Sequence, residues 1–369
     1  MRAQTKPRLD FSPQDILDFT RYKYQKELRN IKGPQFVLWE VTHACNLRCR
    51  HCGIAAGRPG DDELNTEQAI NVLDNISKSG ISALMLLGGE PLVRKDIVEL
   101  LSYASRQFQT LVCTNGVLLS KEYARRLRDA GQDICIAVSL DGASPQSHDF
   151  IRGEGNFAKA MEGIKNCLEV GLQVSVMATI SQANLAELPD MIKLAQDLGV
   201  SPFSVKEFIP CGRGERISQL ALTTEQRKEM SEYLAERCQE PFPCIYFPDD
   251  PYCFLALDEE FQQSCFDLYD PEMVIGDASG ISLCAVKPNG EVMPHPGIRI
   301  VIGDLKQQSL GEIWQSSSLL KQLRNRDNLG GKCGRCEYKF LCGGSRAVAY
   351  QFCGDVMAED PRCWHEPSL

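Results

Sequence analysis

The stretch that decides the fold is Cys45-Asn-Leu-Arg-Cys49-Arg-His-Cys52, in which three cysteines are separated by three and then two residues. Cysteine-ligated iron–sulfur clusters normally have four thiolate ligands, so three would leave one iron of a four-iron cluster open. An open coordination position is typical of a catalytic metal site. The apolar residues 36–42 predict a strand, so the cysteines follow its carboxyl end, where α/β barrels carry their chemistry. A zinc knuckle or three separately buried cysteines are the alternatives.

The spacing of these cysteines resembles the cluster motif of the radical S-adenosylmethionine (radical SAM) superfamily. The resemblance implies that Cys45, Cys49 and Cys52 hold a [4Fe-4S] cluster. It also implies that the amino and carboxylate groups of S-adenosylmethionine chelate the open iron. An electron from the cluster then splits the sulfonium, and the 5′-deoxyadenosyl radical takes a hydrogen atom from the substrate.

Composition and charge narrow the class of protein. The chain has 369 residues and a formal net charge of −9, which argues against a nucleic-acid-binding surface. No apolar run is long enough to span a membrane, and no apolar signal core follows the first residues, so we expect a cytoplasmic protein. The 17 cysteines of a cytoplasmic chain indicate metal binding rather than disulfides. Because exposed clusters are oxygen-sensitive, we also expect an anaerobic setting.

Apolar strands alternate with amphipathic helices from residue 35 to about 215, which predicts parallel βαβ units. The expected strands are residues 36–42, 83–87, 110–114, 134–140, 173–180 and 203–208. Six such units predict an α/β fold with a partial (β/α)6 barrel, the radical SAM barrel that the resemblance implies. We expect residues 1–34 to form a helical extension, with a helix over about 12–28, and residues 216–275 to cover the substrate cavity.

Several polar motifs follow the predicted strands. Gly88-Gly89-Glu90-Pro91 follows the second strand, where glycines allow close backbone approach and a carboxylate can accept a hydrogen bond from an ammonium group. This motif resembles the radical SAM sequence that holds the amino group of S-adenosylmethionine. By the same resemblance Asn115, Ser139 and Asp141 are candidate cofactor contacts, the last two with the ribose, although turns and helix caps use the same residue types. We expect Arg152 to be a carboxylate partner.

The glycine-rich residues 210–215 follow the sixth strand, and we expect them to face adenine or substrate. No catalytic acid or base is identifiable from spacing.

The C-terminal residues 276–369 change pattern. Residues 281–294 predict a β-hairpin with Asn289-Gly290 in its turn. Further on, four cysteines have a spacing suited to a closed iron–sulfur or zinc site. These are Cys333, Cys336, Cys342 and Cys363. The region resembles the SPASM domain, a small irregular α+β extension, and the resemblance implies at least one auxiliary [4Fe-4S] cluster.

This C-terminal region departs from the SPASM pattern, in which two auxiliary clusters are bound. His295 and Arg346 stand where the pattern has cysteines. Cys284, His295 and Cys353 are therefore candidate ligands of a second auxiliary cluster, since imidazole can replace thiolate. The alternative is that this second site binds no cluster.

The resemblance implies a reaction class and two kinds of substrate. One subgroup modifies ribosomally made peptides, and another modifies tetrapyrroles, for example by oxidative decarboxylation of coproheme propionates. Residues 333–347 and 359–363 look most like the tetrapyrrole subgroup. A reductant such as flavodoxin or ferredoxin is the expected partner. A non-catalytic electron carrier is the remaining alternative, and the intact Gly-Gly-Glu-Pro sequence argues against it.

Overall fold

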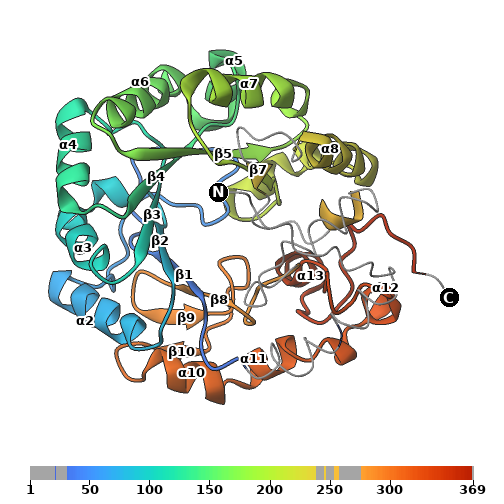
Figure 1. Ribbon diagram of the computed structural model, residues 1–369. Coiled ribbons are helices and arrows are strands. Elements are labelled where there is room, and N and C mark those ends of the chain that lie inside the picture. The colour runs from blue at the N-terminus through green and yellow to red at the C-terminus, as the bar shows by residue number, and fades with distance from the viewer. Residues whose placement is uncertain (1–20, 22–30, 238–244, 247–252, 257–275, 368–369) are drawn as a thin grey trace, which may run out of the picture.

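The computed structural model describes residue 21 and residues 31–237, 245–246, 253–256 and 276–367 (Figure 1). The predicted helix over residues 12–28 lies outside this part of the chain, apart from Arg21. Much of the predicted cavity-covering segment, residues 216–275, lies outside it as well. The proposed domain boundaries therefore stay predictions.

The described strands form one sheet, and the predicted α/β barrel fold is confirmed. Their bounds are β1 Phe36–Glu40, β2 Ala83–Leu87, β3 Gln109–Thr114, β4 Ile134–Ser139, β5 Gln173–Ile180, β6 Phe203–Glu207, β7 Ile245–Tyr246, β8 Leu283–Val286, β9 Glu291–Met293 and β10 Gly303–Asp304. The strand order is β10-β9-β8-β1-β2-β3-β4-β5-β6-β7. Strands β1 to β7 pair in parallel, as right-handed βαβ units require.

The C-terminal hairpin extends this sheet. Strand β8 pairs in parallel with β1, and β9 pairs antiparallel with β8, which confirms the predicted hairpin. In Figure 1 the hairpin lies beside β1, and the last helices occupy the side of the molecule facing β7 and α8. The C-terminal region therefore continues the barrel wall.

Helices cover the outer face of the curved sheet, and further helices such as α12 and α13 lie in the C-terminal region (Figure 1). Their bounds are α2 Thr66–Ser77, α3 Ile97–Ala104, α4 Lys121–Ala130, α5 Pro145–Arg152, α6 Asn156–Glu169, α7 Leu188–Leu198, α8 Thr224–Arg237, α10 Leu310–Ser316, α11 Ser318–Leu323, α12 Gly331–Arg335 and α13 Arg346–Cys353. Short 3-10 helices are η2 Pro91–Val93, η3 Leu185–Glu187, η4 Gly212–Leu220, η5 Cys253–Ala256 and η6 Arg326–Asn328. None of the described helices is long and apolar enough to cross a membrane.

The two faces of the strands differ in burial, because successive side chains of a strand point to opposite sides. On β2, Leu84 and Leu86 are fully buried beneath the helices. Met85 and Leu87 point to the other face and are only partly buried, packing with Leu38 of β1. On β2 the inward-facing side chains are therefore more exposed than those beneath the helices.

Candidate active site and auxiliary cysteine site

The three cysteines of the first motif lie on the loop that follows β1. Backbone N–H groups already point at two of the sulfurs: Leu47 donates to Cys45 Sγ and Ala56 to Cys52 Sγ, each at 3.4 Å. Burial raises the pKa of the Cys45 thiol to about 11. Metal ligation requires the thiolate, so cluster binding must displace this proton. Three thiols on one loop, with amide donors beside them, fit a cluster that keeps one open position.

The glycines after β2 pack directly against this cysteine loop. The Gly89 N–H donates to Thr42 O at 2.7 Å, and the Glu90 N–H donates to Ala44 O at 2.8 Å. A Cβ atom on Gly88 would lie 2.5 Å from Thr42 O, and one on Gly89 would lie 2.1 Å from Ala44 O. Close backbone packing therefore explains both glycines before any ligand is considered, and their contact with the cofactor stays a prediction.

The Glu90 carboxylate organises two strand ends. It is buried and accepts hydrogen bonds from Thr114 Oγ1 at 2.7 Å, Asn115 N at 2.8 Å and Leu92 N at 3.0 Å. Asn115 in turn donates through Nδ2 to Asn46 Oδ1 on the cysteine loop, at 2.8 Å. Burial raises the pKa of the Glu90 carboxyl group despite these hydrogen bonds. The structure thus brings Glu90, Asn115 and the cysteine loop together.

Asp141 is the centre of a buried charge cluster behind the cysteine loop. Its Oδ2 lies 2.6 Å from Arg152 Nε and 3.4 Å from His51 Nε2, while Oδ1 accepts the Thr179 N–H at 2.9 Å. Burial alone would raise the pKa of Asp141, but Arg152 and His51 hold it below its ordinary value. Arg152 is thus the carboxylate partner that the sequence predicted. Both Asp141 oxygens have protein partners, and the predicted ribose contacts of Asp141 and of partly buried Ser139 stay predictions.

Arg213, in the glycine-rich segment after β6, fastens the cysteine loop. Its Nε donates to Cys49 O at 3.0 Å, its Nη1 to Ala56 O at 2.8 Å, and its backbone N–H to Cys52 O at 3.0 Å. Sequence reasoning placed this segment against adenine or substrate and gave neither Arg213 nor His51 a role. The available signal was the position of the segment after a barrel strand, beside the other strand-end motifs.

The predicted auxiliary cysteines come together at the C-terminal end of the chain. One pocket is lined by all four: Cys333, Cys336, Cys342 and Cys363. The Gly344 N–H donates to Cys342 Sγ at 3.2 Å, and the Asp360 N–H donates to Cys333 Sγ at 3.3 Å. Burial raises the pKa of the Cys336 thiol to about 12. Four converging thiols fit a closed four-thiolate cluster.

Cys336 also has neighbours that could ligate a metal. Ligand atoms of Cys336, Glu337 and His365 lie within 4.8 Å of one another, and His365 Nε2 is 3.1 Å from Glu337 Oε1. This arrangement keeps the zinc alternative chemically reasonable for the isolated C-terminal region.

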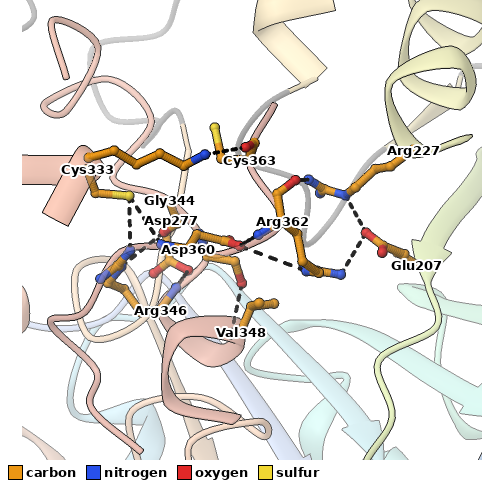
Figure 2. A network of polar contacts seen from close by, with 12 residues as sticks. Glu207, Arg227, Asp277, Cys333, Gly344, Arg346, Val348, Asp360, Arg362 and Cys363 are labelled. Carbon is orange, nitrogen blue, oxygen red and sulfur yellow. Dashed lines mark hydrogen bonds and ion pairs between the residues drawn. The ribbon is translucent and has the colours of Figure 1, made fainter. Parts of the chain in front are cut away.

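Arg346 lies beside this auxiliary site (Figure 2). Its buried guanidinium donates to the carbonyls of Gly344, Val356 and Ala358. Its Nη2 also lies 3.8 Å from Cys333 Sγ. The arginine thus stabilises the loops around the four cysteines and places a positive charge beside one ligand.

A chain of ion pairs links the auxiliary site to the barrel (Figure 2). Glu207, at the end of β6, lies 2.7 Å from Arg362 Nη1 and also pairs with Arg227 of α8. Arg362 Nε lies 3.9 Å from Asp360, whose N–H donates to Cys333. The position of the auxiliary loop is therefore coupled to the barrel wall.

The predicted second auxiliary cluster stays a prediction, and its three candidate ligands lie in different surroundings. Cys284 on β8 is fully buried in the apolar core, and burial raises its pKa to about 12. Cys353 is exposed at the end of α13. His295 Nδ1 accepts the Gly297 N–H at 2.9 Å within its own loop. Strand alternation turns the Cys284 side chain towards the core.

Comparisons with known proteins agree with this geometry. The model of the radical SAM superfamily matches residues 39–195, and that of the SPASM iron–sulfur cluster-binding domain matches residues 264–337. An AdoMet-dependent heme synthase of Methanosarcina barkeri is 31% identical over 91% of this chain and 97% of its own length. The mycofactocin maturase MftC of Mycobacterium tuberculosis is 28% identical over 92% of this chain and 86% of its own. The structure of Streptococcus suis SuiB bound to S-adenosylmethionine aligns with a TM-score of 0.74 at 18% identity, covering 97% of this chain and 84% of SuiB.

Fold, cysteine loop and relatives together define a radical SAM iron–sulfur enzyme. The chain belongs to the radical SAM superfamily and carries a C-terminal SPASM domain. Its cofactors are a [4Fe-4S] cluster with S-adenosylmethionine in the barrel and auxiliary iron–sulfur in the SPASM domain. The electron-carrier alternative is thereby set aside.

Proposed function

We propose that this enzyme oxidatively decarboxylates a propionate side chain of a heme-type tetrapyrrole. The observation that carries the proposal is the 31% identity to the M. barkeri heme synthase over nearly the whole of both chains. In balance, a propionate and S-adenosylmethionine give a vinyl group, carbon dioxide, methionine and 5′-deoxyadenosine. When bound, the cluster supplies the electron that cleaves S-adenosylmethionine, and one electron is given back as carbon dioxide leaves.

The barrel's inner face suits such a substrate. Partly buried Met85, Leu87 and Met177 present apolar surface for a macrocycle. Lys206 of β6 shares the inner face, because Phe203 and Val205 pack into the outer core. Apolar surface combined with a cation fits a flat macrocycle that carries carboxylates.

The protein groups proposed to hold the cofactors are those that the sequence singled out. Cys45, Cys49 and Cys52 hold the catalytic cluster, and the Gly88–Pro91 turn, Asn115, Ser139 and Asp141 line the place of S-adenosylmethionine. Cys333, Cys336, Cys342 and Cys363 hold the auxiliary cluster. The converging thiols and their amide donors support these assignments.

We also propose that flavodoxin or ferredoxin reduces the enzyme in an oxygen-free cytoplasm, without a nucleic-acid or membrane partner. A four-iron cluster with an open iron needs a one-electron donor and is sensitive to oxygen. The net charge of −9 supports the absence of a nucleic-acid partner.

Maturation of a ribosomal peptide is the second candidate, favoured by the likeness to the mycofactocin maturase. One experiment separates the two. The reconstituted enzyme is incubated anaerobically with dithionite, S-adenosylmethionine and coproheme, and the tetrapyrrole is analysed by mass spectrometry. The proposal predicts loss of the mass of formic acid per converted propionate. Unchanged coproheme, together with turnover of a peptide encoded beside the gene, would support the maturase function instead.

A further inference from the structure

An ion pair joins the SPASM domain to the inner face of the barrel. Glu40, the last residue of β1, is fully buried and lies on the same strand face as Leu38, which belongs to the inner apolar cluster. Arg299, in the segment between β9 and β10, directs Nη1 to Glu40 Oε1. The two residues are 259 positions apart, so only the fold brings them together.

Half of the Arg299 guanidinium makes no hydrogen bond to the described part of the chain. Within the described ranges its only hydrogen bonds are from Nη1, to Glu40 Oε1 and to Pro296 O at 3.5 Å. The Nε–Nη2 edge, which binds carboxylates in a bidentate manner, makes none in this part of the chain. The Arg299 side chain is 33% exposed, whereas Glu40 is wholly buried. Glu40 Oε2 is also buried without a hydrogen-bond partner among the described residues.

The guanidinium lies at the same end of the barrel as the cysteine loop. Its partner Glu40 is the last residue of β1, and the loop that carries Cys45, Cys49 and Cys52 follows this strand. A carboxylate bound by Arg299 would therefore be held at the reactive end of the barrel.

We propose that Arg299, oriented by Glu40, binds a carboxylate of the substrate through its Nε–Nη2 edge. The inference rests on the proposed function, because it assigns the recognition of a tetrapyrrole propionate to this residue. Glu40 is a positioning residue that fixes the other side of the guanidinium and offsets its charge while the site is empty of substrate. The contrasting account is that the ion pair only fastens the SPASM domain to β1.

Binding of coproheme and of its tetramethyl ester separates these accounts, because the ester keeps the macrocycle but loses the carboxylates. Dissociation constants are measured by porphyrin absorbance on the cluster-loaded protein with S-adenosylmethionine present. Arg299→Gln should weaken coproheme binding on the order of tenfold or more and leave ester binding unchanged. Arg299→Lys keeps the charge without the planar fork and should fall between wild type and Arg299→Gln.

Two further variants complete the design. Glu40→Gln should weaken coproheme binding less than Arg299→Gln does, and again without affecting the ester. Arg125→Gln alters an exposed arginine on α4 and should change neither constant.

The outcomes distinguish the inference from the function on which it rests. If wild type binds neither porphyrin, the tetrapyrrole function fails and the inference fails with it. If wild type prefers coproheme to the ester but both Arg299 variants keep that preference, the inference alone is overturned. Parallel loss of coproheme and ester binding in Arg299→Lys, with the iron content retained, would indicate a purely structural ion pair and also overturns it.

Discussion

Replacing Asp141 by alanine should destabilise the protein far more than removal of an ordinary surface charge. Asp141 is fully buried, and its Oδ2 lies 2.6 Å from Arg152 Nε, whose side chain is only 10% exposed. Removing one partner of a buried ion pair leaves the other charge uncompensated, which costs about 3–5 kcal/mol. The lost hydrogen bond from Thr179 N adds to this cost. The net expectation is a loss of about 4 kcal/mol in the free energy of unfolding.

Urea unfolding of the cluster-free protein measures this loss without a contribution from metal binding. The companion variant Asp141→Ala/Arg152→Met removes both charges and should recover about 1–3 kcal/mol relative to the sum of the single changes. Glu169→Ala is a suitable control, because Glu169 and its partner Lys121 are both more than half exposed. That change should cost less than about 1 kcal/mol.

Two results would refute this reasoning. A loss for Asp141→Ala no larger than that of the Glu169 control would mean that the buried charge cluster contributes little. Strict additivity in the Asp141/Arg152 cycle would mean that the two groups do not stabilise one another.

Three other predictions follow from the same geometry. Glu90→Gln replaces one carboxylate oxygen by an amide N–H₂, which meets the Asn115 N–H in one orientation and the donors Leu92 N and Thr114 Oγ1 in the other, and should cost about 1–3 kcal/mol in urea unfolding; unchanged stability would contradict the role given to Glu90. Cys333→Ser should lower the iron content of the reconstituted protein, whereas Cys353→Ser should not. Iron loss in the Cys353 variant would indicate that Cys353 is a ligand of a second auxiliary cluster. In the cluster-free protein the raised thiol pKa values of Cys45 and Cys336 favour the folded state while these thiols are protonated, so stability should fall as the pH rises from about 9 towards 11–12. The melting temperature of the cluster-free protein should therefore fall over this range, and a flat profile would contradict the burial of these thiols.

The barrel could be predicted because its strands and helices are encoded by patterns within short stretches of sequence. Apolar strands and amphipathic helices alternate with short connections, and all six predicted barrel strands are found within two residues of their expected ends. Helix α5 was missed although its signals are present: Ser144 caps the helix, Pro145 follows, and Gly153 ends it. Pairing of β8 with β1 joins residues almost 250 positions apart, and no local pattern encodes such a contact.

The residues of the candidate sites also fall into two groups, those predicted from local sequence and those recognised only in the structure. The first three cysteines and the auxiliary four could be read from spacing, because ligand number and separation reflect the cluster itself. Partnerships such as Glu40 with Arg299 and Asp141 with His51 carry no periodicity and appear only in the folded chain. Cys284 was proposed as a ligand from its position in the SPASM pattern; the structure places its side chain in the apolar core, and its role as a ligand stays a prediction.

The most direct test of the account is an anaerobic assay for 5′-deoxyadenosine. The reconstituted protein is given dithionite, S-adenosylmethionine and coproheme, beside a variant in which Cys45, Cys49 and Cys52 are alanine. The account predicts 5′-deoxyadenosine from wild type, formed faster with coproheme than without it, and none from the variant, which should keep the iron of its auxiliary site. Failure of a fully loaded wild-type protein to form 5′-deoxyadenosine, or equal formation by the variant, would contradict it.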